Sequence, residues 1–210
     1  GRIVELYAAL PEPKRLMMMA DHGFTRLKTE VDVNAWLKEK GYLSLGPARD
    51  EWDASAILSA SRAFALDPAR IYVHDRQRFV RGSVEPEQKE QVLADIVQGL
   101  ESLSWQGQPV LEKVHPGKEL YDGPMADRAP DLVLTARPGF DLKAKFDRQE
   151  VFGLFGRTGS HTADGAIFYD SMGQQPESIR HIGQLVLEGY GLDAPAKGLS
   201  SGSGSIMTSA

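Results

Sequence analysis

The chain has 210 residues, 41% of them hydrophobic and 25% charged, a length and composition typical of a globular protein with one or two domains and a sizeable core. Its net charge of −5 argues against binding to polymeric nucleic acid, and no apolar run reaches the roughly 18 residues that a membrane-spanning helix needs. The absence of cysteine excludes disulfides, cysteine-ligated metals and a cysteine nucleophile. It also weakly favours a cytoplasmic location. A signal peptide before Gly1 would instead indicate export.

The first elements of the chain are predicted from apolar spacing. Residues 2–10 have helical spacing that ends at Pro11. Residues 16–20 form an unbroken apolar run, which is typical of a strand buried on both faces of a parallel sheet. A short helix is predicted at residues 33–40, with Gly41 as its C-terminal cap.

The rest of the chain continues to alternate between strands and helices. A helix is predicted at residues 86–103, where Val92, Ile96, Leu100 and Leu103 share one stripe, and another at residues 178–189. A turn is expected at Asp67-Pro68 and a solvated charged loop over residues 143–150. Further strands are predicted at residues 63–66, 71–74, 110–114, 131–135 and 166–169.

This alternation predicts an α/β layered fold with a mainly parallel central sheet. Residues 1–197 would form one α/β unit. The Gly/Ser-rich residues 198–210 are predicted to be a flexible tail.

Asp21-His22-Gly23 directly follows the most apolar predicted strand. Sites in open α/β sheets form at the carboxyl ends of strands, and a carboxylate beside an imidazole suits a divalent metal such as zinc. As a bare tripeptide the motif fits equally a helix-capping Asp and a surface His.

His161 is the second candidate, because it sits among small residues just before the strand predicted at 166–169. A turn position is the alternative role for it. For His74, His115 and His181, structural or surface roles are expected.

These segments together resemble a known family. Met19-Ala20-Asp21-His22-Gly23-Phe24, Ala129-Pro130-Asp131-Leu132-Val133 and the Gly159-Ser160-His161 loop with Gly165-Ala166-Ile167-Phe168 are similar to motifs of the type I phosphodiesterase/nucleotide pyrophosphatase branch of the alkaline phosphatase superfamily. Residues 33–43 and 179–192 are similar to two of its helices. The resemblance covers roughly residues 1–195 and corresponds to the C-terminal half of that family's domain.

The resemblance implies an alkaline-phosphatase-like fold and a metal-dependent hydrolase of phosphate esters, with phosphodiesters or nucleotide pyrophosphates as small-molecule substrates. Two divalent metal ions are expected, zinc first and manganese as the alternative. Asp21 and His22 would bind one ion, and His161 the other.

The same resemblance shows what this chain lacks. The family's Thr or Ser nucleophile, a further Asp and an Asp-x-x-x-His pair all precede the segment that corresponds to Asp21-His22-Gly23. Residues 1–20 contain no Asp, His, Ser, Thr or Cys. The expectation is therefore a C-terminal portion of a longer enzyme, inactive alone, whose nucleophile lies upstream of Gly1 in a missing N-terminal half. The alternatives are another superfamily enzyme, of the cofactor-independent phosphoglycerate mutase or sulfatase type, and a non-catalytic fragment.

Overall fold

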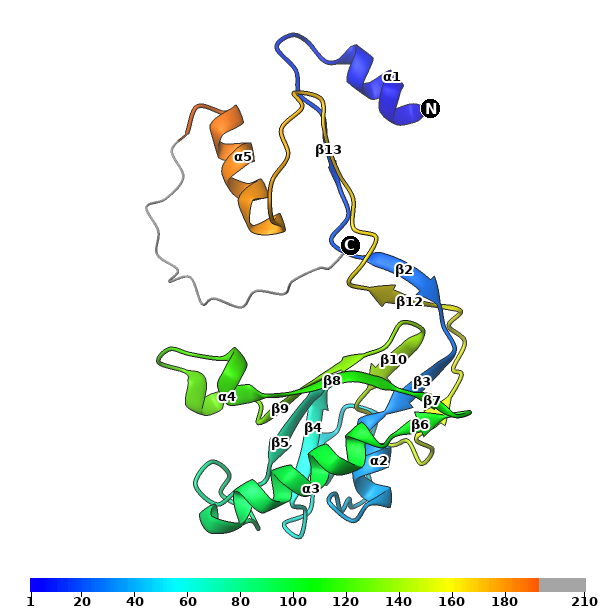
Figure 1. Cartoon of the computed structure of the whole chain (residues 1–210), viewed down its shortest axis with the longest axis vertical. Helices are drawn as coiled ribbons and strands as arrows, with labels where there is room; N and C mark the ends of the chain where they lie inside the picture. Colours follow the sequence, from blue (N-terminus) through cyan, green and yellow to red (C-terminus); the bar gives the residue numbers. More distant parts are fainter. Residues whose placement is uncertain (193–210) are drawn as a thin grey trace. The chain divides into compact units, whose positions relative to one another are not determined.

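The computed structural model describes residues 1–192, which divide into two units (Figure 1). Among the described residues, the smaller unit consists of Gly1–Phe24 and residues 161–192, and the larger unit of residues 25–160. Two paired strands, β2 (Gly23–Arg26) and β12 (Gly159–Thr162), carry the chain from one unit to the other. The predicted tail at residues 198–210 lies outside the described residues.

The smaller unit contains two helices and a two-stranded antiparallel ladder. Met17 pairs with Asp170, and Met19 with Phe168. The elements are α1 (Arg2–Ala9), β1 (Met17–Met19), β13 (Phe168–Asp170), the 3-10 turn η4 (Ile179–His181) and α5 (Ile182–Gly189). The predicted helices and the two apolar strands of this unit are therefore present.

Apolar side chains of the smaller unit remain uncovered by the described residues. Every buried hydrophobic side chain of the described chain lies between Leu27 and Phe146, in the larger unit. Met18 and Met19 are 36% and 50% exposed, so the prediction that their strand is buried on both faces is wrong. The reason is that β1 has a single neighbouring strand, β13, in a two-stranded ladder.

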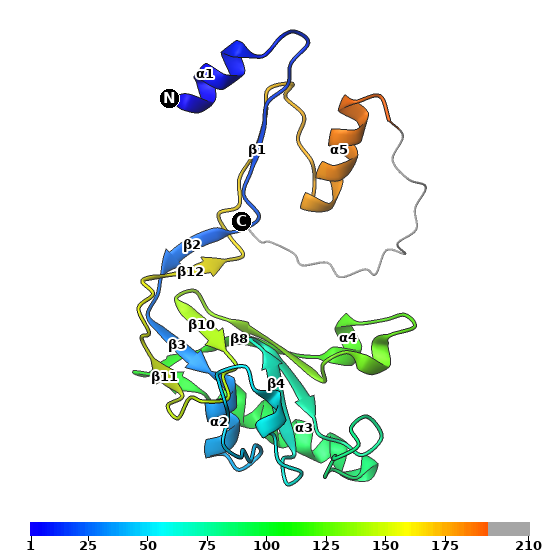
Figure 2. The ribbon, with the colours of Figure 1, turned by 180° about the vertical axis from the view of Figure 1, so that it is seen from behind.

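The larger unit is built on two small sheets, seen from behind in Figure 2. The first is antiparallel with strand order β4-β5-β9-β8, and the second has the order β10-β3-β11. The strands are β3 (Thr29–Asp32), β4 (Ala63–Asp67), β5 (Arg70–Val73), β8 (Leu111–Pro116), β9 (Leu132–Ala136), β10 (Phe140–Lys143) and β11 (Phe152–Gly153), with a short hairpin of β6 (Ser104–Trp105) and β7 (Gln108–Pro109).

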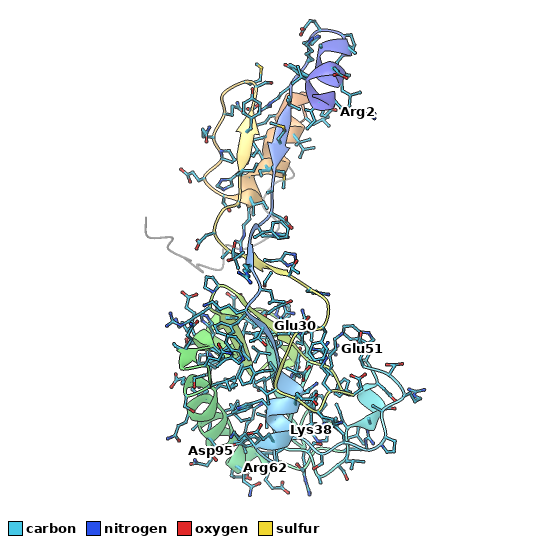
Figure 3. All side chains as sticks on the ribbon, turned by 90° about the vertical axis from the view of Figure 1, so that its right-hand side faces the viewer. Arg2, Glu30, Lys38, Glu51, Arg62 and Asp95 are labelled. Atoms are coloured by element: carbon cyan, nitrogen blue, oxygen red, sulfur yellow. The ribbon has the colours of Figure 1, made fainter. Side chains whose placement is uncertain are left out.

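The helices of the larger unit pack their apolar stripes into one core. In α3 (Lys89–Glu101) the predicted stripe is confirmed, because Val92, Ile96 and Leu100 are buried. The other helical elements are α2 (Val33–Glu39), η1 (Ala54–Ala56), η2 (Pro86–Gln88), α4 (Gly117–Leu120) and η3 (Ala126–Arg128). Side chains fill the space between these elements around the labelled Glu30 and Lys38 (Figure 3).

A buried amide closes one edge of the four-stranded sheet. Asn34 of α2 is fully buried, donates from Nδ2 to the carbonyl of Ala65 and accepts at Oδ1 from the N–H of Ala65, both over 2.9 Å. The side chain thus imitates a neighbouring strand for β4 and satisfies two backbone groups that an edge strand would leave open. Asp32 caps the same helix by accepting from the N–H of Ala35 over 2.8 Å.

The predicted mainly parallel central sheet is absent from the described residues. Their one parallel ladder joins β10 to β3, and the fold is mixed α/β with small, mostly antiparallel sheets. The alternation of elements was misleading because β4 and β5 are joined by a two-residue turn at Pro68-Ala69, which permits only antiparallel pairing. This turn lies one residue later than predicted, with Ala69 at a φ of 75°.

The charged segment predicted as a solvated loop is also partly buried. Lys143 and Lys145 are 8% and 7% exposed. Lys143 pairs with Asp141 over 2.6 Å, and Lys145 pairs with Glu51 over 2.9 Å. The prediction was wrong because both lysines have a carboxylate partner, Lys143 in its own strand and Lys145 in a distant segment, and these pairs permit burial of the long aliphatic stems.

Candidate functional site

Asp21 and His22 lie in the bend between β1 and β2, in the smaller unit. The Oδ1 of Asp21 is 3.4 Å from Nε2 of His22, and Nδ1 of His22 is 3.2 Å from the carbonyl oxygen of Gly23. Both ring nitrogens of His22 thus face an acceptor oxygen, and a neutral imidazole can donate a hydrogen bond to one of the two. The Asp21 side chain is 70% exposed, and that of His22 is 32% exposed.

His161 lies beside His22. Their ring centroids are 4.1 Å apart, with the rings tilted by 41°. Phe24 meets both rings edge-on, at 5.0 Å from His22 and 5.3 Å from His161. The expected position of Asp21 and His22 at the end of a central parallel strand is wrong, because β1 pairs antiparallel with β13.

Gly23 permits the close approach of the two segments that carry the histidines. A Cβ at this position would lie 1.9 Å from the backbone oxygen of Asp164 and 2.7 Å from Oγ1 of Thr162. The Thr162 hydroxyl donates to the same Asp164 oxygen over 2.7 Å. A side chain at position 23 would therefore push the loop of residues 162–164 away from the strand that follows His22.

These residues do not form a complete metal site by themselves. Within residues 1–192, no group of three His, Cys, Asp or Glu side chains is arranged to hold a metal ion. Structural zinc sites have four protein ligands, and catalytic sites commonly have three. The donor types at Asp21, His22 and His161 suit zinc, but their number and arrangement fit at most a partial site.

The remaining histidines differ in burial, since His74 is buried, His115 is partly exposed and His181 is exposed. His74 is 5% exposed, and its Nδ1 is 2.8 Å from the carbonyl oxygen of Ser61. His115 lies 3.2 Å from the Thr135 hydroxyl through Nε2. His181 belongs to η4.

The ion pair that organises the smaller unit was not predicted from the sequence. Arg15 Nε donates to Asp170 Oδ1 over 2.8 Å, and Arg15 Nη2 donates to Oδ2 over 2.7 Å. Backbone N–H groups of Met172 and Gln174 donate to the same carboxylate, and Arg15 Nη1 reaches the Leu185 carbonyl in α5. The Arg15 hydrogen bonds hold the pKa of Asp170 well below its usual range. A polar residue directly after the apolar run 166–169 was the one available sign.

No described helix is long and apolar enough to cross a membrane. The search of curated proteins and the search of solved structures gave no match. A model of one family, described as type I phosphodiesterase / nucleotide pyrophosphatase, matches residues 2–164. The matched segment is most of the chain and contains Asp21, His22 and His161. The chain therefore belongs to the type I phosphodiesterase / nucleotide pyrophosphatase family.

Proposed function

We propose that this chain is the C-terminal portion of a metal-dependent enzyme that hydrolyses phosphodiester or nucleotide pyrophosphate bonds. Asp21 and His22 would bind one divalent ion and His161 the other, with zinc as the first choice and manganese as the second. The proximity of the His22 and His161 rings, brought together from distant parts of the sequence, is the observation that carries this proposal. Bound ions of this kind activate a hydroxyl nucleophile and stabilise the leaving oxygen.

The residues of this chain would orient the metal-binding histidines but would not provide all of the metal ligands or the nucleophile. The Asp21 carboxylate and the Gly23 carbonyl orient the ring of His22, and the tight packing at Gly23 keeps the His161 strand beside it. Within residues 1–192 the ligand set stays partial. The missing ligands and the Thr or Ser nucleophile would come from sequence upstream of Gly1, so that the chain alone is inactive.

The uncovered apolar surface of the smaller unit supports this reading. Helix α1 has no buried residue, and its Ile3, Val4 and Leu6 are 57%, 68% and 69% exposed. Isolated helices need about 12 residues to be even marginally stable in water, and α1 has eight. A two-stranded ladder is also only marginally stable when nothing packs against it. The missing N-terminal half of the same domain is the partner that we expect to cover these elements.

Hydrolysis of bis-p-nitrophenyl phosphate tests the proposal. The chain alone, with zinc or manganese added, should turn over poorly or not at all, because positioning and an activated nucleophile supply much of the rate in such sites. Coexpression with the upstream part of the reading frame should give activity that Asp21→Ala abolishes and that Asp122→Ala, at an exposed residue of the larger unit, leaves intact.

Other outcomes distinguish the alternatives. Hydrolysis of p-nitrophenyl sulfate in preference to the diester would favour a sulfatase, and interconversion of phosphoglycerates would favour a mutase. A completed protein that lacks all three activities would favour a non-catalytic role. Robust turnover by the chain alone would show that it contains an unrecognised nucleophile.

A further inference from the structure

A second candidate site lies wholly within the larger unit. A groove of about 770 Å³ runs between α3 and the segment of residues 116–132, and pockets that bind small molecules commonly measure about 300–1,000 Å³. The apolar part of its lining includes Leu93, Ala94, Val97, Pro116, Pro130 and Leu132. None of the candidate metal ligands belongs to this groove, so it is independent of the proposed hydrolase function.

The inner wall of the groove contains two basic side chains, Lys89 and Arg78, and both form ion pairs with carboxylates of the protein. Lys89 Nζ lies 2.7 Å from Asp131 Oδ1 and 3.0 Å from Asp75 Oδ2, and Arg78 Nη1 lies 3.1 Å from Asp131 Oδ2. The carboxylates of Asp75 and Asp131 are 3% and 9% exposed. Two cations thus face two buried carboxylates, and the wall offers no uncompensated positive charge to an anionic ligand.

The rim of the groove carries an excess of negative charge. Lys118 pairs with Glu90 over 3.9 Å, and both side chains are largely exposed. Glu101 and Asp127 also line the groove and are exposed. Within residues 1–192 neither of them has an ion-pair partner. Two acidic groups therefore border an apolar floor without a compensating cation.

We propose that this groove binds a small organic cation with an apolar body. The apolar part would be removed from water against Leu93, Val97 and Leu132, and the positive head would lie near Glu101 and Asp127. Burial of apolar surface supplies most of the affinity of such a ligand, and the exposed carboxylates select its charge.

Methyl NMR spectra of the full chain test the proposal with three probes that share one alkyl chain. Decyltrimethylammonium, decyl sulfate and decyl maltoside are each titrated below their micelle concentrations. We expect saturable shifts of the Leu93, Val97 and Leu132 methyl groups with the ammonium probe at the lowest concentration. Equal affinity for the sulfate probe, or shifts confined to the uncovered surface of the smaller unit, would overturn the proposal.

Variants separate the charge selection from the apolar contact. Glu101→Gln and Asp127→Asn should each weaken binding of the ammonium probe by about fivefold, the effect of one unit charge at about 4 Å in water, and should leave the maltoside unchanged. Glu112→Gln removes an exposed carboxylate of the larger unit outside the groove and serves as the matched control. Ala94→Trp, at an exposed helix position, should fill the groove and abolish the methyl shifts. Undiminished binding to the Glu101 and Asp127 variants would refute the charge assignment.

Discussion

The imidazole rings of His22 and His161 lie with their centroids 4.1 Å apart, although the whole larger unit separates these residues in sequence. His22 precedes β2 and His161 lies in β12, and the two strands pair. The contact therefore follows from the chain's own pairing at the point where it leaves the smaller unit and returns to it.

Zinc binding by the chain should involve both histidines and should be weak. A zinc titration followed by histidine ring NMR signals should shift His22 and His161 together, because the rings are neighbours. The weakness follows from the partial ligand set, since firmly held zinc has three or four protein ligands. His22→Ala should remove the shifts, whereas His115→Ala, in the larger unit, should not. Nanomolar affinity that is insensitive to His22→Ala would place the site elsewhere.

Gly23→Ala should separate the two histidines. The added Cβ would meet the backbone oxygen of Asp164 at 1.9 Å, a contact that only backbone displacement can relieve. Nuclear Overhauser effects between the rings of His22 and His161 report the distance directly and should be lost. Gly183→Ala is the matched control, because a Cβ there meets no atom within 4 Å and the helix gains propensity. Retained ring contacts in Gly23→Ala would contradict this role of Gly23.

Asn34→Ala should destabilise the larger unit by about 2–6 kcal/mol. The substitution leaves the buried N–H and C=O of Ala65 without partners, at a cost of about 1–3 kcal/mol for each group. Urea unfolding followed by the fluorescence of the buried Trp36 measures the loss. Gln91→Ala removes an exposed side-chain hydrogen bond to Asp95 and should cost less than about 0.5 kcal/mol. Equal effects of the two substitutions would mean that the Asn34 amide does not support β4.

The Arg15–Asp170 pair predicts an acid-sensitive smaller unit. The pKa of Asp170 is lowered in the folded chain, chiefly by hydrogen bonds from Arg15, whereas an Asp in an unfolded chain has a pKa of about 3.9. The ion pair therefore makes its full contribution to the free energy of unfolding at pH values above the pKa of the unfolded Asp. This contribution is progressively lost as the pH falls below about 4. Amide exchange of residues 168–174, measured between pH 7 and pH 3, should show this loss.

Asp170→Asn is the variant that isolates the pair. It should weaken amide protection of residues 168–174 at pH 7 and should flatten the pH dependence in this window. Arg15→Lys keeps the charge but loses the two-pronged contact, so we expect an intermediate effect. Asp122→Asn in the larger unit should behave like the unchanged chain. A wild-type pH profile in Asp170→Asn would assign the acid sensitivity to other carboxylates.

Local patterns in the sequence determined most helices, several strands and the identity of the candidate residues. The stripe of Val92, Ile96 and Leu100 predicts its helix because side chains three to four residues apart share one face. The run before Asp21 predicts a strand because a short apolar segment without helical spacing favours extended backbone. The Asp21-His22-Gly23 and Gly159-Ser160-His161 motifs were sufficient to indicate the family, which the match over residues 2–164 confirms.

Only the tertiary structure decided strand direction, burial and the partners of charged side chains. The same apolar strand can pair in parallel or antiparallel, and the choice depends on the connection, as at Pro68-Ala69. The Lys145–Glu51 pair, the Arg15–Asp170 pair and the Asn34–Ala65 hydrogen bonds all join residues that are far apart along the chain. The spacing of apolar residues indicates which face of a single segment is buried. The contacts above depend instead on which other segment packs against that face. For this reason the sequence indicated candidate ligands, and only the fold showed that His22 and His161 are neighbours.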